Sequence, residues 1–370
     1  MTERRTDDLS GTSHRLPDAL RSHDRSTGRA APDKESVPPP VTANGRIADD
    51  GHGRAADSPK EIPAKGWKDI AVRVKRQLKE DNVGLIGAGV AFYSFLALFP
   101  ALIALISLYG LLVERSQVRE QVESLLTSVP EEQKAVITTQ LQELTDGSKS
   151  GLTLGLVISV LVAIWSASGG MRALMTGLNI AYDETESRKF VRLRLLSIGL
   201  TVGVLLFTII ALTAVIGIPA AFDAGEPIGV VLGLLRWPLL GALLVAGLAF
   251  LYRYAPDRDK PQWTWASWGA GIATALWLLM TIAFSFYVSS FSDFNKTYGT
   301  FAGVVVLLTW MSLTAYIVLV GAEINAEIER QTAHDTTTGP ERPLGSRDAY
   351  AADTVGGTAD ELKHERIDKQ

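Results

Sequence analysis

The chain of 370 residues contains no cysteine. This absence excludes disulfides, thiol nucleophiles and metal sites built on cysteine ligands. The five histidines all lie toward the two ends of the chain, at positions 14, 23, 52, 334 and 364. The apolar region between residues 86 and 322 therefore has no histidine, which excludes most catalytic triads, histidine-ligated metals and histidine proton relays from it.

Several motifs that mark enzymes are absent as well. The chain has no Walker A loop, no HExxH or GxSxG motif and no glycine-rich dinucleotide fingerprint. Coupling to ATP therefore has no support in this sequence. We predict that the protein is not an enzyme, and we expect no cofactor, no metal site and no nucleic-acid partner.

Long apolar runs are what the sequence has in abundance. A helix needs about 20 apolar residues to cross a hydrocarbon core of roughly 30 Å, and six stretches meet or approach that length: 86–113, 152–170, 195–221, 228–252, 263–288 and 300–322. A soluble fold would have to bury nearly all of them, whereas a bilayer removes that problem. The sequence therefore predicts an all-α polytopic membrane protein, a bundle of six transmembrane helices.

The distribution of Lys and Arg around these stretches predicts the orientation. One set of flanking segments carries 16 Lys and Arg, and the opposite set carries 5. Because the cytoplasmic side collects positive charge, we expect both termini in the cytoplasm of a bacterial cell and the protein in the inner membrane.

The two ends of the chain have a different composition from the middle. Residues 1–63 and 331–370 are rich in charged residues, Pro, Gly, Ser and Thr, and such segments bury too little apolar surface to offset the entropy of ordering. We predict two disordered cytoplasmic tails around a membrane domain at 64–330.

Two amphipathic regions flank the first crossing. At 67–81, Trp67, Ile70, Val74 and Leu78 share one helical face and basic residues occupy the rest, the pattern of an interfacial helix that faces anionic lipid headgroups. The alternative is a helix that only anchors the first crossing. Residues 116–145 predict outer-loop helices, with a capping box and proline at 128–131, which either cover a cavity or pack on the bundle.

Polar residues at membrane depth are costly and therefore invite a functional interpretation. Five lie near the cytoplasmic end of the predicted bundle: Asn82, Arg172, Asn179, Glu323 and Asn325. We expect Arg172 and Glu323 to pair, either as a structural lock between helices or as a gate or headgroup site at the inner mouth. Candidates for the outer mouth are Arg236, Asn295, Lys296 and Tyr298; Arg236 either extends to the headgroups or faces a cavity.

Small residues repeat every fourth position in several of the apolar stretches. The pairs are Gly151 and Gly155, Gly199 and Gly203, Gly229 and Gly233, and Gly299 and Gly303. This spacing permits close helix contacts, either inside one chain or between the chains of a homo-oligomer.

Five sequence blocks resemble the YihY/virulence factor BrkB family and appear in its order: GAGVAFYSFLALFP at 87–100, SASGGMRAL at 166–174 followed by GLNIAY at 177–182, LYRYAP at 251–256, NKTYGT at 295–300 with Trp310, and GAEINAE at 321–327. The resemblance covers roughly 67–330. It implies a multi-pass inner-membrane protein with six helices, linked in some members to serum resistance or to lipid or solute export. An older label for relatives, ribonuclease BN, does not fit this chain, because a metal-dependent nuclease needs clustered His or carboxylate ligands.

Two functions follow as alternatives. The first is a transporter or flippase-like protein for a lipid or another amphiphilic solute. The second is a membrane scaffold or envelope-integrity protein that transports nothing. A large cavity open to one side or to lipid favours the first, and a closely packed bundle favours the second. An enzyme acting on membrane substrates is the weakest alternative, because the apolar region lacks His and Cys.

Overall fold

The computed structural model describes residues 50–112, 152–214, 227–290 and 300–368. Within these ranges the chain is helical and has no named strand: η2 Pro59–Glu61, α1 Ala64–Glu80, α2 Val83–Leu112, α5 Leu152–Ala181, α6 Phe190–Leu212, α8 Pro227–Tyr254, α9 Trp263–Ser290, α11 Thr300–Glu329, α12 Tyr350–Asp353 and α13 Ala359–Asp368. The predicted all-α class is confirmed. Each predicted crossing coincides with one long helix, and the predicted interfacial helix coincides with α1. The predicted outer-loop helices at 116–145 lie outside the described residues.

Five helices in the described part of the chain are long and apolar enough to cross a membrane: α2, α6, α8, α9 and α11. The sequence predicts a sixth crossing at 152–170, and α5 is not among the five. Its described part contains the small polar run 166–170 and Arg172, which lower its apolar content. Among the described residues, length and composition therefore support five crossings, one fewer than the six predicted.

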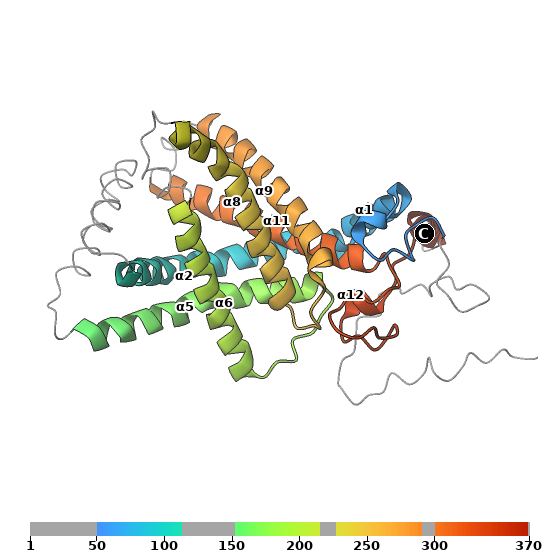
Figure 1. Cartoon of the computed structure of the whole chain (residues 1–370), viewed down its shortest axis with the longest axis horizontal. Helices are drawn as coiled ribbons and strands as arrows, with labels where there is room; N and C mark the ends of the chain where they lie inside the picture. The colour runs from blue at the N-terminus through green and yellow to red at the C-terminus, as the bar shows by residue number, and fades with distance from the viewer. Residues whose placement is uncertain (1–49, 113–151, 215–226, 291–299, 369–370) are drawn as a thin grey trace, which may run out of the picture.

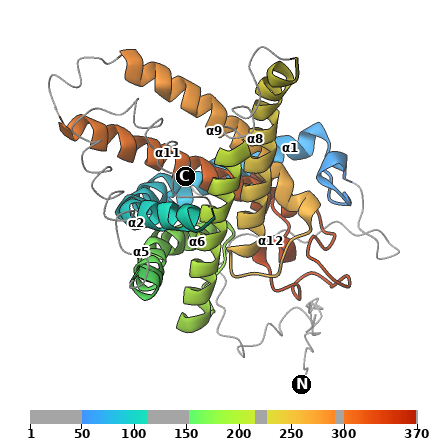
Figure 2. The ribbon, with the colours of Figure 1, turned by 60° about the vertical axis from the view of Figure 1, so that its left-hand side comes forward.

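The long helices pack in two groups that meet at one end. Helix α2 lies along α5, with α11 beside α2 and α6 crossing α5, as Figure 1 shows. Helices α8 and α9 pack together, and α9 also contacts α11. Helices α9 and α11 cross near α1 and separate toward their other ends (Figure 2). Many large apolar side chains on these helices face outward, among them Leu279, Ile282 and Phe286, as expected for a surface that contacts lipid.

The largest buried cluster lies where α5, α8 and α11 converge. Leu178 and Tyr182 from α5 and the residue after it, Tyr252 from α8, and Leu319 from α11 are almost completely buried there. The hydroxyl of Tyr252 donates a hydrogen bond to the backbone oxygen of Val318, 2.7 Å away. A buried hydroxyl needs such a partner, so this contact fixes α8 against α11.

The expectation of disorder in both tails does not hold for the parts that the structure describes. Residues 50–63 and 331–359 fold against each other at the end of the bundle near α1. The backbone of Ala333 donates to Arg54 O at 2.9 Å, and the hydroxyl of Thr332 donates to Ala56 O at 2.7 Å. Arg347 donates to the backbone oxygens of Ala333, His334 and Ala352. Composition fails here because buried arginines and many small alanines replace large apolar residues in this packing. Residues 1–49 and 369–370 lie outside the described residues.

Candidate functional site

Charged side chains gather where the folded tail segments meet the helices. We call this region the cap; it comprises residues 50–63, α1, residues 255–262 and residues 331–359. Several of its arginines and carboxylates, and those of the adjoining turn of α11, are almost completely buried. Buried charges persist only when they are paired and hydrogen-bonded, so the partners of each group show what the cap joins.

Arg73 on α1 is fully buried and connects three segments of the chain. Its guanidinium contacts the carboxylate of Glu327 on α11 and donates to Gln331 Oε1 at 2.7 Å and to the backbone oxygen of Gly357 at 3.0 Å. Arg330 donates to the other oxygen of Glu327 at 2.8 Å. This network fastens α1 and the chain after Gly356 to the end of α11.

A second buried pair joins the α8–α9 link to α11. Arg258 donates two hydrogen bonds to Glu329, at 3.0 and 2.6 Å, and both side chains have no exposed surface. Thr336 donates a further bond to Glu329 at 2.8 Å. Burial alone would lower the pKa of Arg258, but the charge of Glu329 outweighs it and the pKa is raised. The pair therefore stays charged and holds the cap to the bundle.

Asp335 organises the loop that follows α11. It accepts bonds from the backbone and hydroxyl of Thr337 at 2.9 and 2.7 Å and from the backbone of Arg342 at 2.9 Å. Burial raises the pKa of Asp335, but these bonds and Arg347 outweigh burial and lower it below its ordinary value of 3.8. A carboxylate with a lowered pKa stabilises the fold above its ordinary pKa and loses this contribution as pH falls through the lowered value.

We therefore expect the loop at 335–347 to loosen when the pH falls below 3.8, the ordinary aspartate value. Hydrogen exchange of the loop amides at pH 6 and at pH 3, corrected for intrinsic rates, measures this. The variant Asp335→Asn carries no titrating group at this position, so its loop should show a smaller difference between the two pH values. An equal difference in both proteins would contradict the role assigned to Asp335.

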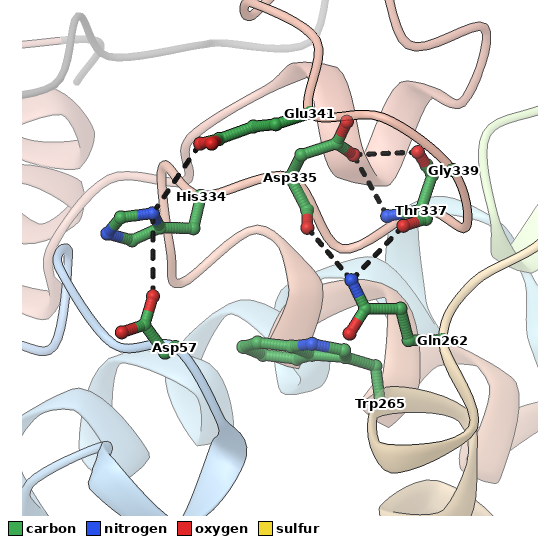
Figure 3. A pocket seen from close by; sticks show the side chains of 8 residues that line it. All are labelled: Asp57, Gln262, Trp265, His334, Asp335, Thr337, Gly339 and Glu341. Atoms are coloured by element: carbon green, nitrogen blue, oxygen red, sulfur yellow. Dashed lines mark hydrogen bonds and ion pairs between the residues drawn. The ribbon is translucent and has the colours of Figure 1, made fainter.

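The cap contains a polar pocket of about 290 Å³. It is lined by Asp57, Gln262, Trp265, His334, Asp335, Thr337, Gly339 and Glu341 (Figure 3). His334 lies between two carboxylates, 3.5 Å from Asp57 and 3.9 Å from Glu341, and the Gln262 amide donates to the backbone oxygens of residues 335 and 337. Among the described residues no group of three or more His, Asp or Glu is placed to hold a metal ion. These contacts join three segments of the cap.

The structure brings together only part of the predicted inner-mouth cluster. Asn179, Glu323 and Asn325 are buried, whereas Asn82 is exposed between α1 and α2 with a positive φ of 51°. Arg172 does not form the predicted pair with Glu323. Its guanidinium lies over the ring of Phe190, 5.9 Å from the centroid. Arg172 lies against α6, whereas Glu323 is buried on α11.

The two buried asparagines bind backbone groups, so they join segments. Asn179 accepts a bond from the backbone of Asp257 at 2.8 Å and donates to Glu186 at 3.1 Å. Asn325 on α11 accepts from the backbone of Gly269 at 2.7 Å and donates to Ala266 O at 3.1 Å. Both contacts of Asn325 are made with the first turns of α9, which fixes the crossing of α9 and α11.

Of the predicted outer-mouth residues only Arg236 lies in the described part of the chain. It is partly buried on α8, with its guanidinium 5.3 Å from the centroid of the Trp237 ring. Asn295, Lys296 and Tyr298 lie outside the described residues, so a role for them at an outer mouth stays a prediction.

Helix α1 packs its apolar face against protein. Ile70 and Val74 are buried against Trp265 and Ile328, so the apolar face contacts protein. Arg73, which the sequence assigns to the basic face, belongs to the buried side. The exposed side carries a row of lysines at helical spacing, which we call the lysine face: Lys65, Lys68, Lys75 and Lys79.

An apolar groove of about 430 Å³ runs between α9 and α11 and ends at α1. Its lining is made of Leu78, Leu276, Leu279, Met280, Ala283, Tyr316, Ile317 and Val320. The α9 residues recur every three or four positions and so share one face of that helix. Leu78 follows the buried face of α1 and lies next to the lysine face, so the groove has positive charge at one end.

The buried charges are not among the residues that sequence patterns single out. Glu327 and Glu329 show no metal-ligand spacing in the sequence, and Arg73 is one of several basic residues in 67–81. One signal was available for Arg73, since it lies at helical spacing from Ile70 and Gln77 and therefore on the apolar side of α1. No local sequence pattern predicts the ion pair of Arg258 and Glu329, because the two residues are separated by 71 positions.

Comparisons with known proteins place the chain among membrane proteins. The profile of a family described as virulence factor BrkB matches residues 74–344, which includes part of the cap. The Bacillus subtilis (strain 168) protein named putative ribonuclease-like protein YfkH is 31% identical over 252 residues, covering 66% of this chain and 89% of the relative. A UPF0761 membrane protein of Rhodospirillum centenum is 26% identical over 275 residues, and the chain spans only 59% of its length. A UPF0761 membrane protein of Tolumonas auensis is 26% identical over 282 residues, 71% of this chain and 86% of the relative. No solved structure matches the chain.

Proposed function

Because the chain belongs to the virulence factor BrkB family and is an integral membrane protein, we propose that it binds a lipid or another amphiphile and moves it across the bacterial inner membrane. The groove between α9 and α11 is the observation that supports this function. A volume of about 430 Å³ with an apolar lining suits an acyl chain, since ligand pockets of about 300–1,000 Å³ enclose small molecules.

The lysine face supports an amphiphilic ligand over a purely apolar one. Leu78 lines the groove, and Lys75 and Lys79 are exposed on the same helix. Lysines at a membrane surface attract anionic headgroups, at roughly 1 kcal/mol each. A ligand with its acyl chain in the groove would place its headgroup near Lys75 and Lys79.

The position of the folded tails supports an even number of crossings. Residues 50–63 precede the first long helix and residues 331–359 follow the last, and the two segments hydrogen-bond to each other. This contact supports placing both ends of the membrane domain on the same side of the bilayer, which requires an even number of crossings. We keep α5 as the sixth proposed crossing, and the excess of Lys and Arg near this end favours the cytoplasm for it.

Filling the groove should stop transport without unfolding the protein. Ala283 lines the groove, and the neighbouring Ile282 is exposed outside it. In liposomes that carry a fluorescent phospholipid, dithionite reduction reports lipid that reaches the outer leaflet. We expect Ala283→Phe to reduce the protein-dependent rate at least fivefold, because the ring occupies the chain-binding space, and Ile282→Phe to leave it unchanged.

The competing function is a scaffold that transports nothing. Its support is the close helix packing and the structural role of the buried asparagines. If the wild-type protein moves no more labelled lipid or amphiphile than protein-free liposomes do, the scaffold is the better account. We do not extend the ribonuclease part of the name YfkH to this chain, since among its described residues no metal-holding group is found.

A further inference from the structure

Two arginines lie at the contact between α5 and α6, each against an aromatic side chain of the other helix. Arg194 on α6 lies over the ring of Trp165 on α5, 3.7 Å from the centroid, and donates to Trp165 O at 2.7 Å. Arg172 on α5 lies over Phe190 on α6, 5.9 Å from its centroid. Each arginine is thus positioned by an aromatic side chain of the other helix, a contact that favours the cation.

Neither arginine has an anionic partner in the part of the chain that the structure describes. Glu186 and Asp257, from the links that precede α6 and α9, both pair with Arg188 instead. Nε of Arg194 is buried and makes no hydrogen bond. The positive charge of Arg172 is close enough to repel the charge of Arg194. Two neighbouring cations on a membrane helix pair repel each other and are costly unless an anion joins them.

Large apolar side chains are exposed beside both arginines, together with the cationic Lys189 and Arg192. Trp165 and Phe190 are more than half exposed, and so are Leu161 one turn before Trp165 and Leu195 beside Arg194. A contiguous exposed apolar patch of this kind marks a site of contact with a membrane or with another protein. The surroundings therefore favour an anion that carries acyl chains over a free inorganic ion.

We propose that Arg172 and Arg194 bind the phosphate group of an anionic phospholipid whose chains lie along Leu161 and Leu195. Guanidinium groups form charge-assisted hydrogen bonds with phosphate oxygens, and the two aromatic rings hold the guanidinium groups in place. The site is formed by α5 and α6, whereas the groove is formed by α9, α11 and α1. Lipid binding here does not require transport, so the two proposals can fail separately.

Native mass spectrometry of the purified full-length protein in neutral detergent tests this site. Titration with phosphatidylglycerol should give a bound lipid at concentrations where phosphatidylcholine gives none. The double variant Arg172→Gln/Arg194→Gln should need at least tenfold more phosphatidylglycerol for half-saturation. The control Lys60→Gln/Lys363→Gln removes the same charge from exposed residues outside the helix bundle and should bind as the wild type does.

The outcomes separate the lipid from other anions. Equal half-saturation for the wild type and the arginine double variant overturns the proposal. Binding of inorganic phosphate without any preference for phosphatidylglycerol overturns the lipid assignment. If the double variant does not fold, the single variants Arg172→Gln and Arg194→Gln are used. Each is expected to weaken phosphatidylglycerol binding at least threefold, and no weakening in either also overturns the site.

Discussion

Replacing Glu329 with alanine is expected to lower the free energy of unfolding by about 3–5 kcal/mol, the usual cost of leaving a buried charge without its partner. Arg258 has no exposed surface and directs two hydrogen bonds at Glu329. The substitution leaves that guanidinium without an anion and also removes the acceptor of Thr336. Thermal unfolding of the detergent-solubilised protein, followed by tryptophan fluorescence, measures the loss.

A double variant shows whether the loss comes from the unpaired charge. Arg258→Met/Glu329→Leu replaces both charges with apolar groups of similar length, and such exchanges are often neutral or stabilising. We expect it to recover most of the stability that Glu329→Ala loses. A double variant less stable than the single one would show that shape, rather than charge, dominates at this position.

Replacing Gly269 with alanine is expected to destabilise the protein by roughly 3 kcal/mol or more, from overpacking and from lost hydrogen bonds. A Cβ atom at this position would overlap the backbone oxygen of Gly321 and the Asn325 side chain. Backbone on the other helix cannot move aside as a flexible side chain can. Displacing Asn325 would also break its bonds to Gly269 and Ala266. The yield of monodisperse protein and its unfolding temperature report the effect.

Gly271, two positions after Gly269 on α9, is a matched control for this substitution. A Cβ atom at Gly271 would meet nothing within 4 Å. Alanine is favoured over glycine inside a helix by about 1 kcal/mol, so Gly271→Ala should be neutral or slightly stabilising. If Gly269→Ala and Gly271→Ala behave alike, the close approach of α9 and α11 does not limit stability.

The glycine pairs found in the sequence do not mark this crossing. Gly199 and Gly203 have open space where a Cβ would lie, and so does Gly303. The close approach is made by Gly269 on α9 and Gly321 on α11, so neither helix carries both glycines. A spacing rule within one helix cannot identify which glycine meets a neighbouring backbone, because that depends on how two helices cross.

The sequence by itself determined the helices, since apolar length is a local property that the bilayer selects. It also identified Asn179, Glu323 and Asn325 as polar residues of the buried end. Only the tertiary structure decided their partners, the partners of Arg73, the pairing of Arg258 with Glu329 and the folding of both tail segments into one cap. These contacts join positions that are as many as 290 residues apart. Their energies exist only once the helices have met, so no local pattern of hydrophobicity or charge encodes them.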